Sequence, residues 1–115
     1  MRSLVWLLGA TLLVAAACGG TAAPSAAQPI AVTVKEWSIA PAKLAAKAGT
    51  VTFLVKNGGT IEHDFAIEGV GKVETIIAGD SKSLTVTLAP GTYVVLCSLS
   101  GHKEAGMHGT LVVSP

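Results

Sequence analysis

Apolar residues recur at every second position over much of the chain from Ile30 onward. The alternating sets are Val32/Val34, Val51/Phe53/Val55, His63/Phe65/Ile67, Leu84/Val86/Leu88 and Leu111/Val113. A period of two is that of a strand with one buried face, whereas an amphipathic helix repeats every 3.6 residues. The pattern therefore predicts short β-strands. It leaves no room for a long helix, although residues 41–48 are compatible with a single helical turn.

Glycine and proline separate these segments, because glycine permits a positive φ and proline sets φ at the start of a turn. The predicted turns are Lys47-Ala48-Gly49, Asn57-Gly58-Gly59, Gly69-Val70-Gly71, Ala78-Gly79-Asp80 and Ala89-Pro90-Gly91. The segment from Tyr93 to Cys97 is apolar throughout, which predicts a strand covered on both faces. Short strands at this spacing predict an all-β fold, a Greek-key β-sandwich of about seven strands. Such a fold supports many activities, so the function has to be inferred from a site.

The first 17 residues do not share this pattern. A short positive start, Met1-Arg2-Ser3, precedes an uncharged apolar run over residues 4–17. That run is shorter than the roughly 20 residues with which a helix crosses a bilayer, and it has the layout of an export signal. It ends in Val14-Ala15-Ala16-Ala17-Cys18-Gly19, which resembles the cleavage box of bacterial lipoproteins. We predict a signal peptide over residues 1–17 and a lipid on Cys18, with ordinary cleavage at a small-residue site as the alternative.

Residues 18–29 are small and polar and contain two prolines, which predicts a flexible tether. The remaining residues, 30–115, are enough for one domain with a modest core. We therefore expect an exported protein on the periplasmic or extracytoplasmic face of a membrane, anchored through Cys18.

The charges are few and balanced. The chain has eight Lys and Arg residues and seven Asp and Glu residues, and Arg2 would leave with the signal peptide. Phosphate binding needs a basic surface, and no cluster of Lys or Arg is present. This excludes nucleic acid as an expected partner.

The two cysteines, Cys18 and Cys97, have separate interpretations. In an exported chain they could form a disulfide. Cys18, however, lies at the signal junction, and Cys97 lies among residue types that bind metals. A free thiol in an oxidising compartment is prone to oxidation unless something occupies the sulfur.

The segment after the last apolar strand carries the candidate chemistry. Cys97, His102 and Met107 follow one another at five-residue intervals, and His63 opens another strand. Thiolate and thioether sulfur stabilise Cu(I), and imidazole serves both oxidation states, so two imidazoles, a thiolate and a thioether suit copper. Zinc sites draw their sulfur more often from paired cysteines. The spacing predicts one copper ion bound by these four residues.

The chain resembles the cupredoxin family of blue copper proteins over residues 30–113. The resemblance rests on Asn57 with His63-Asp64-Phe65, on Pro90-Gly91-Thr92-Tyr93, and on Cys97-x4-His102-x4-Met107-x-Gly109. The loop length is similar to that of the auracyanin and rusticyanin members. The resemblance implies that His63, Cys97 and His102 are equatorial ligands and that Met107 is the axial one, with electrons passing through the edge of His102.

Neighbouring residues are also interpreted through the resemblance. Asp64 and Ser98 lie where family members often join the two ligand segments by a hydrogen bond, and the family usually has Asn at the position of Asp64. We hypothesise that a carboxylate there lowers the potential. His108 is interpreted as a solvated loop residue outside the ligand set, and Trp37 and Tyr93 as core or corner residues.

The predicted function is one-electron transfer between redox partner proteins by a monomer. Leu99, Gly101, Ala105 and the edge of His102 are expected to form a small docking surface. Copper delivery or storage is the alternative. An enzyme is not expected, because four protein ligands leave no open position on the metal and three histidines leave no set for a second copper.

Overall fold

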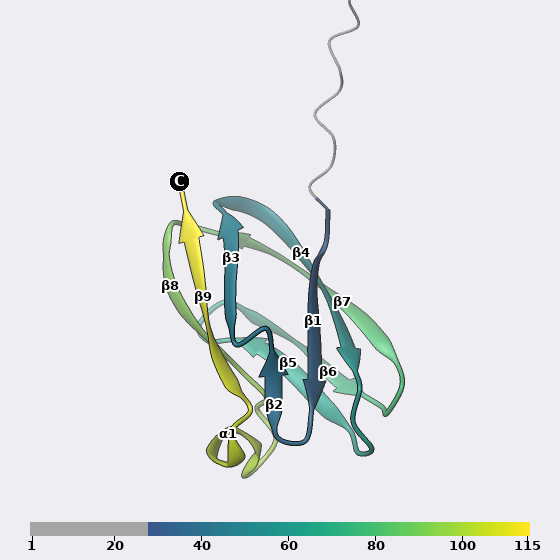
Figure 1. The fold of residues 1–115 in the computed structure, drawn as a ribbon. Helices are drawn as coiled ribbons and strands as arrows, with labels where there is room; N and C mark the ends of the chain where they lie inside the picture. Colours follow the sequence, from purple (N-terminus) through teal and green to yellow (C-terminus); the bar gives the residue numbers. More distant parts are fainter. Residues whose placement is uncertain (1–27) are drawn as a thin grey trace, which may run out of the picture.

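The computed structural model describes residues 28–115, in which two β-sheets pack face to face (Figure 1). One sheet has the order β2-β1-β4-β7 and contains β1 (Ile30–Lys35), β2 (Ser38–Ala40), β4 (Gly49–Asn57) and β7 (Ser81–Leu88). The other has the order β3-β9-β8-β5-β6 and contains β3 (Lys43–Lys47), β5 (His63–Ile67), β6 (Gly71–Ile76), β8 (Gly91–Leu96) and β9 (His108–Ser114). The predicted β-sandwich is confirmed, with nine strands among residues 28–115 in place of about seven.

The alternating residues face the space between the sheets. Side chains buried there from the predicted strands include Val32, Val34, Phe53, Val55, Phe65, Ile67, Leu84, Leu88, Leu111 and Val113. The rings of Phe53 and Phe65, which come from opposite sheets, lie 5.8 Å apart between centroids. The period of two therefore identified the inner face of each of these strands.

The strands absent from the prediction have weak patterns. β3 replaces the helical turn considered for residues 41–48, and Leu44 is its only fully buried residue. It pairs in parallel with β9, with Leu44 opposite Leu111. Its strand conformation therefore depends on a partner 67 positions away, which local periodicity cannot reveal.

The expectation that the segment from Tyr93 to Cys97 is covered on both faces was wrong. Val94 is 41% exposed, whereas Val95 and Cys97 are fully buried. β8 lies between β5 and β9 within its sheet. Its neighbours therefore cover its edges, while one of its faces remains open to solvent.

The two ends of the sandwich differ (Figure 1). The chain enters β1 and leaves β9 at one end, and the short helix α1 (His102–Ala105) and the β1–β2 turn lie at the other. Within residues 28–115, no helix is long and apolar enough to cross a membrane. The predicted signal peptide, Cys18 and most of the predicted tether lie outside the described residues.

Candidate metal centre

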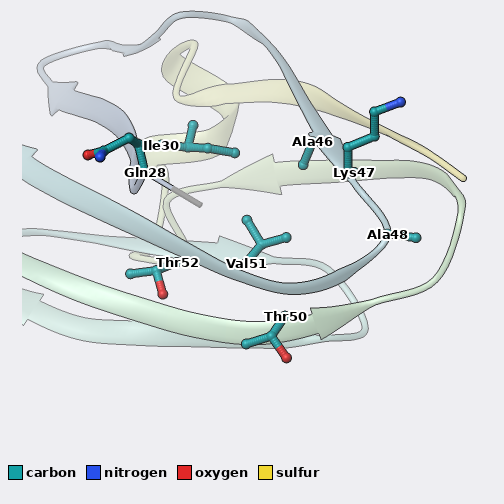
Figure 2. Close-up of a pocket in the computed structure, with 8 residues that line it drawn as sticks. All are labelled: Gln28, Ile30, Ala46, Lys47, Ala48, Thr50, Val51 and Thr52. Carbon is teal, nitrogen blue, oxygen red and sulfur yellow. The ribbon is translucent and has the colours of Figure 1, made fainter. Parts of the chain in front are cut away.

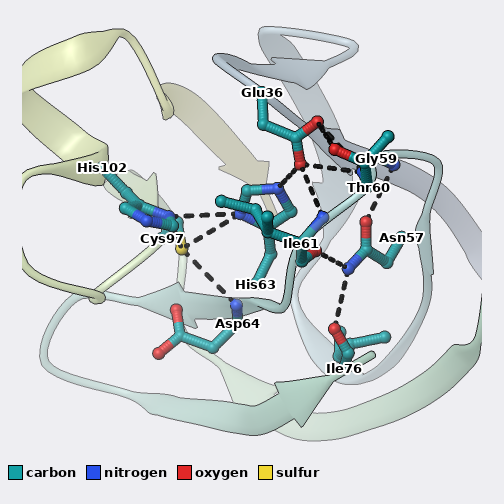
Figure 3. A network of polar contacts seen from close by, with 10 residues as sticks. All are labelled: Glu36, Asn57, Gly59, Thr60, Ile61, His63, Asp64, Ile76, Cys97 and His102. Atoms are coloured by element: carbon teal, nitrogen blue, oxygen red, sulfur yellow. Dashed lines mark hydrogen bonds and ion pairs between the residues drawn. The ribbon is translucent and has the colours of Figure 1, made fainter. Parts of the chain in front are cut away.

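Three of the four predicted ligands meet at the α1 end of the sandwich (Figure 3). His63 opens β5, Cys97 directly follows β8, and His102 opens α1. The Nδ1 atoms of His63 and His102 are 3.2 Å apart, and Cys97 Sγ lies 3.5 Å from Nδ1 of His102 and 4.0 Å from Nδ1 of His63. His63 and Cys97 are fully buried, and His102 is half-buried. The three donor atoms thus form a triangle with sides of 3.2 to 4.0 Å.

The size of this triangle fits a metal ion. The point equidistant from the three atoms, calculated from the three distances, lies about 2.1 Å from each of them. Bonds from imidazole nitrogen and thiolate sulfur to a first-row metal ion are about 2.0 to 2.3 Å long. Two imidazoles and a cysteine sulfur in one plane, with a methionine beside them, are the donor set of a type 1 copper site.

Met107 is placed by backbone hydrogen bonds. Its amide donates to the carbonyl of His102 at 3.1 Å, and its carbonyl accepts from the amide of Cys97 at 3.0 Å. Its side chain is fully buried in the apolar core. The loop therefore folds back on itself and brings Met107 beside Cys97.

Two glycines let this loop pack against the neighbouring segments. A Cβ at Gly106 would lie 2.7 Å from the carbonyl oxygen of Trp37, in the β1–β2 turn. A Cβ at Gly109 would lie 2.5 Å from the carbonyl oxygen of Ala42. Cβ atoms essentially never approach so closely, so these contacts require residues without a side chain. The ligand loop is thereby held against the sandwich on both sides of Met107.

Burial raises the pKa of the Cys97 thiol, against the effect of the hydrogen bond from the backbone N–H of Asp64. That N–H lies 3.4 Å from the sulfur. The thiol of the metal-free protein is accordingly protonated at neutral pH. A thiolate-binding metal has to displace this proton.

His63 is positioned by the segment that precedes it. The buried side chain of Asn57 donates to the carbonyls of Ile61 and Ile76, each at 2.7 Å, and its Oδ1 accepts from the amide of Gly59 at 2.9 Å. One side chain thus joins the end of β4, the segment between β4 and β5, and the end of β6 (Figure 3). Because the polar atoms of the Asn57 side chain are hydrogen-bonded, its burial does not cost stability.

Glu36 is a site residue that the sequence interpretation missed. Its Oε1 lies 2.6 Å from Nε2 of His63, on the side of the imidazole that faces away from Cys97 (Figure 3). The backbone N–H of Thr60, followed by the His63 ring, lowers the pKa of Glu36 to about 2. The carboxylate is therefore ionised at neutral pH. Glu36 lies 27 positions before His63, so no local motif links them, and the only signal was Gly59, where the absence of a side chain makes room for the carboxylate.

The predicted hydrogen bond between the two ligand segments is present. Oδ1 of Asp64 accepts from the amide of Ser98 at 2.6 Å, and Oδ2 accepts from the hydroxyl of the same residue. Asp64 follows His63, and Ser98 follows Cys97. Both segments are thus joined directly next to their ligands.

The interpretation of Trp37 as a core residue was wrong. Its side chain is 48% exposed, and its ring stands edge-on to the rings of His102 and His63, with centroid distances of 5.0 and 6.5 Å. Tyr93 is a corner residue as predicted, because its hydroxyl donates to the carbonyl of Ala89 at 2.7 Å. His108 is exposed and lies outside the ligand cluster.

A hollow at the opposite end of the sandwich offers no competing site (Figure 2). It is lined by Gln28, Ile30, Ala46, Lys47, Ala48, Thr50, Val51 and Thr52. The lining contains no histidine, cysteine or carboxylate. This hollow therefore lacks the side chains that most often bind a metal ion.

Comparison with known proteins agrees with this geometry. The family model of the cupredoxin-like domain matches residues 8–113. Auracyanin-B of Chloroflexus aurantiacus is 56% identical over 39 residues, a match that spans 33% of this chain and 17% of that protein. The structure of dithionite-reduced auracyanin from Roseiflexus castenholzii superposes with a TM-score of 0.70 at 24% identity, over 76% of this chain and 97% of that one. An auracyanin B structure gives 0.69 at 26% identity, over 77% and 90%. The chain belongs to the cupredoxin-like family.

Proposed function

We propose that this protein is a one-electron carrier with a single type 1 copper ion bound by His63, Cys97, His102 and Met107. The observation that carries the proposal is the triangle of His63 Nδ1, Cys97 Sγ and His102 Nδ1, whose sides of 3.2 to 4.0 Å match a trigonal metal plane. The copper ion would supply the Cu(II)/Cu(I) couple. The similarity to auracyanins supports the same function.

The residues of the chain would contribute a site that changes little between the two oxidation states. The ligands come from β5, the end of β8, α1 and the start of β9, and these segments are joined by Asn57, by the Asp64–Ser98 contact and by the Cys97–Met107 hydrogen bond. Movement of the ligands on reduction would add to the barrier for electron transfer. Supports of this kind around the ligands would keep this movement small.

Electrons would enter and leave at the α1 end. His102 is the half-buried ligand, and exposed Gly101, Ala105 and Trp37 lie around it. We propose this patch as the docking surface for redox partner proteins, since transient redox contacts are small. The balanced charge of the chain argues against docking driven by one dominant charge sign.

We also propose that the domain is exported and attached to a membrane through a lipid on Cys18. The chain enters β1 at the end opposite α1 (Figure 1). A tether attached there would leave the copper end facing away from the membrane and accessible to partners. Mass spectrometry of the protein from its native membrane tests the lipid, and an unmodified mature N-terminus after Cys18 would contradict it.

Copper delivery is the alternative that the same ligands allow, and two measurements on the purified protein separate it from electron transfer. A carrier shows a reversible one-electron wave in voltammetry and retains its metal through repeated cycles. It also retains Cu(I) in the presence of a competing thiol such as glutathione. Rapid loss of Cu(I) to the thiol, with no reversible wave, would contradict electron transfer and favour delivery.

A further inference from the structure

We propose that Glu36 is a positioning residue, which orients His63 through its Nε2–H and favours Cu(II) over Cu(I) at the metal centre. The inference rests on the proposed copper function. It concerns the carboxylate behind one ligand rather than the ligand set itself.

The contact between Glu36 and His63 determines which nitrogen faces the metal. An ionised carboxylate can only accept a hydrogen bond, so Nε2 of His63 is the donor across the 2.6 Å contact. His63 is fully buried, and within residues 28–115 Glu36 is the hydrogen-bond partner of this nitrogen. With the proton on Nε2, the lone pair of Nδ1 points toward Cys97 and His102. Carboxylates that accept from a metal-bound imidazole in this way fix its orientation and increase its basicity.

The carboxylate of Glu36 is itself held in place. Oε1 accepts from the amides of Thr60 and Ile61 at 3.1 and 3.3 Å, and Oε2 accepts from the amide and the hydroxyl of Thr60 at 3.0 and 3.2 Å. A Cβ at Gly59 would collide with the carboxylate. The loop before His63 thus forms a closely fitting cradle for a negatively charged group. The side chain of Glu36 is only 21% exposed, so water screens its charge only in part.

The position of this charge predicts its effect on the copper couple. It lies across one imidazole from the metal, and it attracts Cu(II), with two positive charges, more strongly than Cu(I), with one. Removal of the charge should therefore weaken Cu(II) binding more than Cu(I) binding. A supporting group behind a metal ligand is typically worth about 10-fold to 100-fold in metal affinity.

Glu36→Gln is the variant that removes the charge while retaining an acceptor. The amide oxygen can accept from Nε2–H of His63, and the amide nitrogen can donate to the hydroxyl of Thr60. The matched control is Glu62→Gln, which removes the same charge from an exposed residue directly before His63, outside the network of Figure 3. For Glu36→Gln we expect the ratio of Cu(II) to Cu(I) affinity to fall about 10-fold, which corresponds to a reduction potential about 59 mV higher. For the control we expect a much smaller shift.

The hydrogen bond has its own readout in the diamagnetic Cu(I) protein. The Nε2–H proton of His63 should be visible by NMR in the wild-type protein and in Glu36→Gln, and Glu36→Ala should lose it through exchange with water. A potential in Glu36→Gln that is unchanged, lower, or shifted no more than in Glu62→Gln would overturn the inference. So would an Nε2–H proton that persists in Glu36→Ala. Failure of the wild-type protein to form a blue copper site would instead overturn the proposed function.

Discussion

The two sides of the metal centre are built in different ways. Cys97, His102 and Met107 lie within eleven consecutive residues, and the backbone hydrogen bonds that shape this loop join residues of the loop itself. His63 depends on the β1–β2 turn through Glu36, and on the β4–β5 segment and the end of β6 through Asn57. We call the part with Cys97, His102 and Met107 the downstream side and the part with His63 the upstream side. The difference implies that the downstream side is a local motif, whereas the upstream side is a tertiary assembly. Mutations on the upstream side should therefore affect the fold and the site together.

The largest effect is expected from Asn57→Ala. The change leaves the buried carbonyl of Ile76 without its partner, and it also removes the part-buried hydrogen bonds to the carbonyl of Ile61 and from the amide of Gly59. An unsatisfied buried group costs about 1 to 3 kcal/mol and a lost hydrogen bond about 0.5 to 1.5 kcal/mol, so the free energy of unfolding of the metal-free protein should fall by about 3 kcal/mol. Urea denaturation measures this change.

The control for Asn57→Ala is Thr85→Ala, which removes an exposed hydroxyl pair with Thr52 at 2.9 Å. A change at such an exposed site stays within about 0.5 kcal/mol. Equal losses of stability in the two variants would contradict the interpretation that the His63 side of the site is a tertiary assembly.

A smaller loss is expected from Gly106→Ala, which tests how the loop packs against the β1–β2 turn. Gly106 has a φ of 128°, and the added Cβ would lie 2.7 Å from the carbonyl of Trp37. Backbone strain and collision together should cost about 2 kcal/mol and should move Met107, which alters the copper spectrum. Gly79→Ala provides the comparison, because Gly79 also has a positive φ, 85°, but has no atom within 4 Å of an added Cβ.

The Gly79 variant should lose about 1 kcal/mol from strain alone and retain the wild-type spectrum. Unfolding by urea and the visible spectrum of the Cu(II) protein distinguish Gly79→Ala from Gly106→Ala. An unchanged spectrum in Gly106→Ala would show that the contact with Trp37 does not position the loop.

Gly59→Ala should affect the potential more than the stability. The added Cβ would collide with the flexible end of Glu36. The carboxylate can move away, but it then loses its hydrogen bond with His63. The potential should rise as in Glu36→Gln, with a stability loss of about 1 kcal/mol. Gly58→Ala is the neighbouring control, since its Cβ meets only a methyl group of Thr33 at 3.2 Å. Equal potentials in the two alanine variants, measured by voltammetry, would contradict the role of the cradle.

The smallest effect is expected from Asp64→Asn. The amide can still accept from the backbone N–H of Ser98 and can donate to its hydroxyl, so the stability should change by less than about 1 kcal/mol. Loss of a negative charge beside Cys97 should raise the reduction potential slightly. Voltammetry and urea unfolding measure both quantities. If neither changed, the hypothesis that this carboxylate adjusts the potential would have no basis.

The difference between the two sides also explains what could be predicted from the sequence. The fixed spacing of Cys97, His102 and Met107 identified the downstream side, and strand periodicity identified the inner faces of β1, β4, β7 and β9. Local patterns suffice where the structure is local. The contact between Asp64 and Ser98 was expected only from the resemblance to the cupredoxin family, and the structure contains it.

The features that were missed depend on contacts between distant segments. Trp37 is half-exposed, and its ring lies beside the imidazoles because the β1–β2 turn contacts the ligand loop. Neither segment alone predicts that contact. Glu36 joins the site for the same reason. β3 is a strand through its pairing with β9, although its own sequence has a single buried position.

The proposed type 1 copper site is tested by titrating the metal-free protein with Cu(II) and recording its visible and electron paramagnetic resonance spectra. We expect an intense thiolate-to-copper charge-transfer band that saturates at one copper ion per chain and is absent from Cys97→Ser. A colourless complex, or a Cys97→Ser variant with the wild-type spectrum, would contradict it.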